Sequence, residues 1–267
     1  MIDTKRLEAI VSEAARLAMS QWPGAGHAVE SWEKSAGSPV CAADIAVDGF
    51  LMSELGALLP AAAWLSEETA DDPARLASSL IWIVDPIDGT RDFLRGRTGW
   101  AVSVALIEEG RPLVGMLAAP ARGAGEAGEL WTALAGQGAW RNGVPLAAST
   151  RATFPGARVP ADSLAREDRD LVTVDKPNSI ALRLAMVAAD EADLVATLRW
   201  GSEWDVAAAA LIASEAGAQV TDAFGQPLVF NKRDPRAFGL LVSAAAIHAA
   251  AVDRLATRAA RIAGRAI

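Results

Sequence analysis

The chain has 267 residues, which is enough to bury a substantial hydrophobic core in one large domain or two smaller ones. Its formal net charge of −8 disfavours a nucleic-acid polymer or an anionic membrane as a partner. One Cys and two widely separated His residues exclude an internal disulfide and a thiolate zinc cluster, and they disfavour a His-based metal site. A bound metal would therefore be held by carboxylates, which favours Mg²⁺ or a similar hard ion.

The sequence contains no segment typical of insertion into a membrane. No apolar run approaches the roughly 18 residues that span a bilayer. The N-terminus carries Asp3 and lacks an apolar core, so it does not resemble a signal peptide. We therefore expect a cytoplasmic protein.

The first part of the chain predicts helices and a largely antiparallel sheet. Apolar residues at helical spacing indicate a helix over 3–20, which Asp3 or Thr4 could cap, and another over 42–58 with Ile45 on its buried side. Short strands are expected at 29–34, 63–66, 80–84, 100–107, 112–119, 129–133 and 138–140, with turns at 35–39, 108–111 and 142–143.

The second part alternates strands with helices, which is typical of an α/β layer. The irregular stretch 150–170 is the best candidate for a boundary between subdomains. We therefore predict an α+β subdomain over 1–145 and an α/β subdomain over 146–267, joined in one compact catalytic unit. Strands are expected at 171–174, 192–198, 219–221 and 239–243, and helices at 180–189, 206–216 and 244–260.

The most informative stretch is W-I-V-D-P-I-D-G-T-R-D-F at residues 82–93. The apolar run before it predicts a buried strand, and Pro86 should end that strand at Asp85. Asp85 and Asp88 then offer oxygen ligands to a hard cation, and the N–H groups of Gly89 and Thr90 suit phosphate oxygens. An isolated pair of acids at this spacing is more often a solvated turn. The complete run, with its Pro, Gly and Thr, instead indicates a metal-dependent phosphate site.

Three further acids each have an ordinary explanation. Asp44 falls in the first turn of the helix 42–58, where the helix dipole stabilises a carboxylate. Glu67 follows the strand 63–66 and on its own suggests a solvated loop. Asp205 immediately precedes the helix 206–216, where Asp is a favoured N-cap.

Taken together and in this order, the acids and their flanking residues closely resemble the inositol monophosphatase superfamily of Mg²⁺-dependent, Li⁺-sensitive phosphatases. The matching stretches are S-P-V-C-A-A-D at 38–44, L-S-E-E at 65–68, residues 82–93, E-W-D-V-A-A at 203–208 and E-A-G-A-Q-V-T-D at 215–222. The resemblance implies a layered αβαβα sandwich of the inositol monophosphatase and fructose-1,6-bisphosphatase type. It also implies a homodimer.

The resemblance implies two to three Mg²⁺ ions. Glu67, Asp85 and the carbonyl of Ile87 correspond to the ligands of one ion, and Asp85, Asp88 and Asp205 to those of a second. A third, weaker ion would lie near Glu67. This arrangement agrees with elementary electrostatics, because four converging carboxylates would repel one another strongly without cations.

The implied reaction is direct hydrolysis of a phosphate monoester by water that the metal ions activate. Glu67 would orient this water, together with Thr90 hydrogen-bonded to Asp44. N–H groups of the Gly-Thr turn would hold the phosphoryl oxygens. The expected substrate-binding residues are Asp88, Gly89, Thr90 and Asp205.

The identity of the substrate depends on fewer residues. Inositol-specific members often have a Glu where this chain has Leu198, and Asn where it has Asp92. The chain therefore looks more like the branch that hydrolyses 3'(2'),5'-bisphosphate nucleotides, such as adenosine 3',5'-bisphosphate. Inositol 1-phosphate and another sugar or histidinol phosphate are the alternatives. Candidate cations for a second phosphate are Arg91, Arg95, Arg97, Lys176 and Arg183, at least three of which we expect to be solvated surface charges.

Three departures from the family pattern bear on the site. Cys41 stands where Thr usually caps the helix that carries Asp44, Ala209 replaces a usual Gly, and Asn178 replaces Gly in a Gly-Ser pair. A Ca²⁺-stabilised binding protein without enzymatic activity also fits the carboxylates but leaves Thr90 unexplained. A glycosidase would use paired acids too, yet it needs neither the turn nor a metal.

Overall fold

The computed structural model describes residues 2–24, 31–35, 38–123 and 128–264. Its largest element is a seven-stranded sheet of order β3-β4-β5-β6-β7-β8-β9. β3 and β4 are parallel, and every other neighbouring pair in this sheet is antiparallel. The strands are β3 (Ala63–Ser66), β4 (Leu80–Asp88), β5 (Ala101–Glu108), β6 (Arg111–Ala119), β7 (Glu129–Leu134), β8 (Gly138–Arg141) and β9 (Val144–Pro145).

Both predicted hairpin turns are present. Glu109 and Gly110 join β5 to β6 with φ of +46° and +79°, and Asn142 and Gly143 join β8 to β9 with φ of +51° and +76°. Two consecutive positive φ angles are the signature of the turn whose twist matches that of paired strands. Asn and Gly tolerate this conformation well, which is why the sequence signal was clear.

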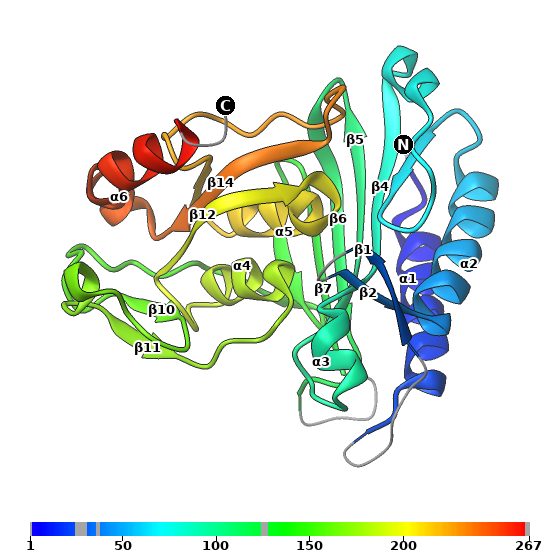
Figure 1. Cartoon of the computed structure of the whole chain (residues 1–267). Coiled ribbons are helices and arrows are strands. Elements are labelled where there is room, and N and C mark those ends of the chain that lie inside the picture. Colours follow the sequence, from blue (N-terminus) through cyan, green and yellow to red (C-terminus); the bar gives the residue numbers. More distant parts are fainter. Residues whose placement is uncertain (1, 25–30, 36–37, 124–127, 265–267) are drawn as a thin grey trace.

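Helices and a second sheet stack on the large sheet in five layers, α–β–α–β–α (Figure 1). α1 (Thr4–Gln21) and α2 (Ala42–Leu58) cover one face, and α4 (Ile180–Ala188) and α5 (Glu203–Glu215) cover the other. The small sheet lies beyond α4 and α5, with strand order β12-β14-β13, and α6 (His248–Ala263) packs on its outer side. This arrangement confirms the predicted αβαβα sandwich. The small sheet consists of β12 (Leu194–Ser202), β13 (Gln219–Thr221) and β14 (Arg236–Ser243).

The middle helical layer is apolar on all sides because it lies between two sheets. Every residue of α4 is buried, and eight of the thirteen residues of α5 are buried, five of them alanine. On β6, Gly115 faces α5 so closely that a Cβ there would lie 2.5 Å from the carbonyl oxygen of Ala208. Absence of a side chain at this position lets the helix approach the sheet.

Short elements complete the chain. They are the hairpin β1 (Ser31–Ser35) and β2 (Ser38–Cys41), the helix α3 (Thr90–Leu94), the parallel pair β10 (Arg158–Pro160) and β11 (Val172–Val174), and the 3₁₀ turns η1 (Pro73–Ala77), η2 (Arg166–Asp168) and η3 (Ala245–Ile247). No helix among the described residues combines the length and apolar character of a bilayer span. The predicted boundary between subdomains at residues 145 and 146 stays a prediction.

Several predicted element bounds were wrong. β4 does not end at Asp85 but continues to Asp88, because a β-bulge opposite β5 accommodates Pro86, which has no N–H to donate to the sheet. Ile45 is exposed, at 48%, because it lies on the outer face of α2. Residues 38–39 belong to β2 rather than to a turn, whereas residues 29–30 of the predicted strand and 36–37 of the predicted turn lie outside the described residues.

Candidate active site

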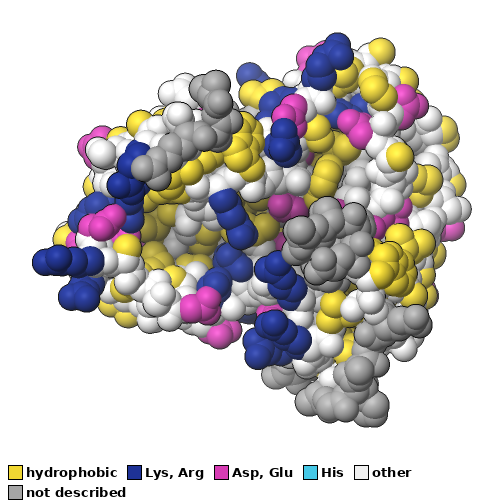
Figure 2. All heavy atoms as spheres, viewed as in Figure 1, with side chains coloured by type: hydrophobic (Ala, Val, Ile, Leu, Met, Phe, Trp, Pro, Cys, Tyr) yellow, Lys and Arg dark blue, Asp and Glu magenta, His cyan; other side chains and the backbone are white. Residues whose placement is uncertain are grey.

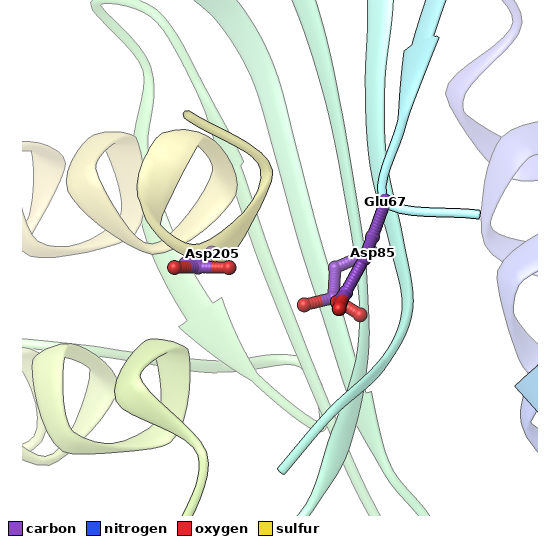
Figure 3. A group of neighbouring side chains, drawn as sticks. All are labelled: Glu67, Asp85 and Asp205. Carbon is purple, nitrogen blue, oxygen red and sulfur yellow. The ribbon is translucent and has the colours of Figure 1, made fainter. Parts of the chain in front are cut away.

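Three carboxylates converge from three different elements. Glu67 follows the last residue of β3, Asp85 lies in β4, and Asp205 lies in the first turn of α5. One oxygen from each lies within 4.8 Å of the other two (Figure 3). The parallel register of β3 and β4, in which Ser66 pairs with Val84, brings Glu67 beside Asp85. Such oxygen-only clusters match the preference of hard divalent cations.

Asp85 is the most enclosed of the three, with only 2% of its surface exposed. Its Oδ1 accepts a hydrogen bond from the N–H of Ile87 at 3.0 Å, which the bulge in β4 makes possible. Burial raises the pKa of Asp85 well above its usual range, and the charges of Glu67, Asp88 and Asp205 raise it further. The carboxylates of this site are therefore more stable when they bind protons or cations than when they are ionised without a partner.

Asp88 is buried beside this group but is held by a different element. Its Oδ2 accepts hydrogen bonds from the hydroxyl of Ser179 at 2.6 Å and from the N–H of Ala181 at 2.7 Å. Ser179 also caps α4 by accepting from the N–H of Leu182 at 2.9 Å. Burial raises the pKa of Asp88, and these hydrogen bonds oppose the rise. The beginning of α4 therefore fixes the orientation of Asp88.

Asp205 does not cap α5, contrary to the prediction. The helix begins at Glu203 with Ser202 as its N-cap, so Asp205 is the third helical residue. From there its Oδ2 accepts from the N–H of Ser202 at 3.1 Å. Burial raises the pKa of Asp205 to about 8, and the charge of Asp88 makes a smaller contribution in the same direction.

Thr90 lines the site, and the charge of Asp44 is near enough to raise the pKa of Asp85. The hydrogen bond predicted between Asp44 and Thr90 does not occur in the described part of the chain. The hydroxyl of Thr90 donates instead to the carbonyl oxygen of Ile87 at 3.1 Å. The reason is the tight turn at Gly89, with φ of +96°, which directs the start of α3 back toward Ile87. Asp44 is buried, and its Oδ2 accepts from the N–H of Cys41 at 2.8 Å.

The substitution at Cys41 does not leave Asp44 loosely held. The bond from the Cys41 N–H uses the backbone, so it does not depend on which side chain stands there. The thiol itself is buried, and burial raises its pKa to about 12, which keeps it protonated. Cys41 therefore acts as a small apolar residue.

Glu67, Asp85, Asp88 and Asp205 line an open cavity of about 370 Å³, together with residues at the N-termini of three helices. These residues are Gly89 and Thr90 at the start of α3, Ile180 of α4 with Asn178 from the loop before it, and Asp205 of α5. The helix dipoles favour an anion here. At α4 the N–H groups of Ala181 and Leu182 already donate to Asp88 and Ser179. The same cavity therefore offers carboxylates to cations and helix termini to an anion. We call it the carboxylate cavity.

Basic side chains surround this cavity. Figure 2 shows Lys and Arg side chains gathered around the central hollow of the face seen in Figure 1. Those that line the carboxylate cavity are Arg91, Lys176, Arg183 and Arg199. Arg199 was not among the cations predicted from the sequence, because a lone Arg in a strand carries no sequence signal.

Arg183 is not a solvated surface charge. It is buried, and its guanidinium donates to the carbonyl oxygens of Pro177 and Asn178, both at 2.7 Å. Burial lowers its pKa, and the charge of Asp88 opposes that shift. Arg183 therefore fastens the loop before α4. Of the other predicted cations, Lys176 pairs with Asp162, Arg97 lies 3.9 Å from Asp92, and Arg91 and Arg95 are exposed.

A hydrogen-bond network that the sequence did not reveal is centred on the buried Arg75. The guanidinium of Arg75 donates to both carboxylate oxygens of Asp71, at 2.6 and 3.0 Å. It also donates to Oδ1 of Asn231 at 2.6 Å and to the carbonyl oxygen of Lys232 at 2.9 Å. Glu203, which is buried, accepts from the N–H groups of Asn231 and Lys232 at 2.6 and 3.1 Å.

This network joins two segments that carry site residues. Asp71 lies in the loop that follows Glu67, and Glu203 lies in the same helical turn as Asp205. The residues of the network therefore tie the loop that carries one carboxylate to the helix that carries another. No local motif predicts this, because the partners are far apart in the chain.

Comparisons with known proteins agree with this geometry. A family model described as the inositol monophosphatase family matches residues 3–261. The 3'(2'),5'-bisphosphate nucleotidase CysQ of Escherichia coli (strain K12) is 33% identical over 212 residues, which are 75% of this chain and 83% of that protein. Inositol monophosphatase 3 of Solanum lycopersicum is 32% identical over 207 residues, 71% of this chain and 75% of that protein.

The fold has equally clear counterparts among solved structures. An IMPase of Thermotoga maritima matches with a TM-score of 0.80 at 26% identity, over 96% of this chain and 97% of that one. Inositol monophosphatase II of Staphylococcus aureus matches with a TM-score of 0.79 at 20% identity, over 98% of each chain.

Replacing Arg75 by Met should lower the free energy of unfolding by about 3 kcal/mol, because it removes the buried guanidinium that donates to Asp71, Asn231 and Lys232. The charge-matched control is Arg6→Met, which removes an exposed pair with Glu54 at 3.9 Å and should cost less than about 1 kcal/mol. Urea unfolding measures both. Equal effects would show that the network contributes no more than a surface pair.

Without added metal, the protein should lose thermal stability as pH rises from about 5 to about 8. The pKa of Asp205 is 3.8 in the unfolded chain and about 8 in the folded chain. The folded state therefore binds more protons than the unfolded state throughout this pH interval, and stability falls as pH rises. A saturating divalent cation should remove most of this loss, because it replaces the protons. Calorimetric midpoints at several pH values, with and without the cation, test this, and the decline should be smaller in Asp205→Asn. A cation-independent profile would contradict a metal site here.

Proposed function

Because this chain belongs to the inositol monophosphatase family and is therefore a metal-dependent phosphatase, we propose that its substrate is a 3'(2'),5'-bisphosphate nucleotide such as adenosine 3',5'-bisphosphate. We further propose Mg²⁺ as the metal, in two to three copies. The observation that carries the proposal is the convergence of Glu67, Asp85 and Asp205 in a cavity that residues at three helix N-termini also line.

The residues at the site suit hard cations. All the converging side-chain donors are carboxylate oxygens, and the raised pKa of Asp85 and of Asp205 reflects burial and charge that cations would neutralise. We assign Glu67, Asp85, Asp88, Asp205 and the carbonyl oxygen of Ile87 as metal ligands. Thr90 already donates to that carbonyl, but a carbonyl oxygen has two lone pairs and can serve both partners.

In the proposed mechanism, bound ions lower the pKa of the attacking water and offset charge on the leaving group. Glu67 orients this water, aided by Asp44 from α2 and Thr90 from α3. The N–H groups of Gly89 and Thr90 bind phosphoryl oxygens, where the α3 N-terminus stabilises the charge that develops during attack. Asp88 and Asp205 complete the substrate-binding set, and Ser179 keeps Asp88 in position.

A second phosphate on the substrate explains the basic surroundings. A cavity of about 660 Å³ adjoins the carboxylate cavity and shares Arg91, Lys176 and Asn178 with it. It adds Arg95, Arg97 and Arg122 to the cations near the site, and its lining also includes Asp92, Asp162 and Asp175, so cations outnumber acids there by five to three. An inositol monophosphate has no second anionic group for these residues. Their concentration at one opening of an acidic protein would also steer a multiply charged anion toward the site.

Inositol 1-phosphate is the second candidate, because the Solanum lycopersicum relative is an inositol monophosphatase of similar identity. The position of Leu198 argues against it. This half-buried side chain packs against an apolar cluster and offers no hydrogen bond to a ring hydroxyl.

A panel of phosphate esters tests the substrate. Phosphate release should be fastest from adenosine 3',5'-bisphosphate, relative to inositol 1-phosphate, fructose 1,6-bisphosphate and histidinol phosphate. Release should require Mg²⁺, stop with chelator and decrease with Li⁺. A wide preference for inositol 1-phosphate would overturn the substrate but leave the mechanism in place.

Replacing Asp88 by Asn should reduce kcat by about 100-fold or more, because one ligand charge is lost where ions offset transition-state charge. The control is Asp253→Asn, which removes the same charge from the exposed side of α6 and should keep wild-type turnover. Circular dichroism and unfolding curves verify that both variants fold. Wild-type turnover of Asp88→Asn at saturating Mg²⁺ would reject the assignment of Asp88.

A further inference from the structure

A third cavity adjoins the carboxylate cavity on the side of the small sheet. It has a volume of about 160 Å³ and shares Ile180, Arg199 and Asp205 with the carboxylate cavity, so the same side chains border both spaces. Its remaining wall is mostly apolar and includes Trp200, Val206, Leu228 and Leu240. Apolar cavities of about 150 Å³ are known to hold a benzene ring. A cavity of this size can therefore receive one ring of a larger ligand.

A β-bulge in β12 brings two consecutive residues to this cavity. Along a regular strand, neighbouring side chains point to opposite faces. The pairing of β12 with β14 shifts between Thr197 and Trp200, and Arg199 and Trp200 consequently line the same cavity. Arg199 also lines the carboxylate cavity, and it therefore lies between the phosphate position and the aromatic ring.

Trp200 is exposed yet held in place. Half of its surface is accessible. Its indole packs edge-on against Phe238 with ring centroids 5.7 Å apart, and the guanidinium of Arg236 lies 5.5 Å from its centroid. Both oxygens of Asp234 in turn accept from Arg236 at 2.8 Å. An ordered aromatic side chain that keeps an open surface beside a catalytic cavity is suited to stacking with a planar ligand.

We propose that this cavity binds the nucleobase of the substrate, with Trp200 as the stacking ring; this rests on the proposed nucleotide specificity. A phosphate at the carboxylate cavity leaves the rest of its substrate in an adjoining space. The space beside Arg91 and Lys176 is charged, whereas the space beside Trp200 is apolar and aromatic. A bisphosphate nucleotide carries one group suited to each. Inositol has only hydroxyls, which would lose hydrogen bonds to water against these apolar walls.

The test compares Trp200→Ala and Trp200→Phe with the wild-type enzyme at saturating Mg²⁺. The measured quantity is kcat/KM for adenosine 3',5'-bisphosphate divided by kcat/KM for inositol 1-phosphate. Stacking on an aromatic side chain should make this ratio fall by about 10- to 100-fold in Trp200→Ala, and Trp200→Phe should restore most of it. The control Val144→Ala truncates another exposed apolar residue, in β9 of the large sheet, that does not line the cavity, and its ratio should change by less than about threefold.

The outcomes separate this inference from the proposed function. If the wild-type enzyme hydrolyses the nucleotide but Trp200→Ala lowers both rates equally, the base site is rejected and the nucleotidase activity stands. If the wild-type enzyme does not hydrolyse the nucleotide, the proposed substrate fails, and the base site fails with it. Sedimentation of each variant provides a further check. Conversion of a dimer to a monomer by Trp200→Ala would assign the aromatic surface to contact between copies and overturn the base site.

Discussion

Repulsion among like charges is the constraint on which the site depends. Glu67, Asp85 and Asp205 lie close together in a partly enclosed space, and the pKa values of Asp85 and Asp205 rise because of burial and neighbouring acids. Side chains free to rotate would separate. Several acids here are prevented from doing so by a backbone N–H that binds one carboxylate oxygen: Cys41 holds Asp44, Ile87 holds Asp85, Ala181 holds Asp88 and Ser202 holds Asp205. The backbone thus maintains an arrangement that the charges alone would disrupt.

Structural features that depend on neighbouring residues were predictable from the sequence, and features that depend on distant residues were not. The hairpin turns were predictable because Gly-containing turns act over a few residues. The αβαβα architecture was implied by the resemblance of the acid-containing stretches to a known family. The end of β4 was not predictable, because tolerance of Pro86 depends on a bulge opposite β5. The hydroxyl of Thr90 was assigned to Asp44 but bonds to Ile87, three residues away, since the turn geometry decides its direction. The network of Arg75 and Glu203 joins residues remote in sequence, and a single sequence contains no signal for such a pair.

The charge distribution reconciles an acidic chain with an anionic ligand. The formal net charge is −8, yet Arg91, Lys176, Arg183 and Arg199 all line the carboxylate cavity. Neutralisation of the carboxylates by cations would leave these residues and the helix N-termini as the dominant local field. Affinity for the anion should then depend on prior occupation by the cation. The three adjoining cavities, one charged, one carboxylate-lined and one aromatic, would give each part of the proposed nucleotide substrate a different chemical environment.

The close packing of α5 against the large sheet determines how wide the site is. Asp85 belongs to that sheet and Asp205 to the helix, so the separation between helix axis and sheet sets the gap across which a cation must be held. At Gly115 the helix backbone approaches so closely that even one methyl group would collide with Ala208. Small residues in this layer, Ala209 among them, therefore fix the distance between α5 and the large sheet. An enlarged side chain there would change the size of ion the site accepts without touching any ligand.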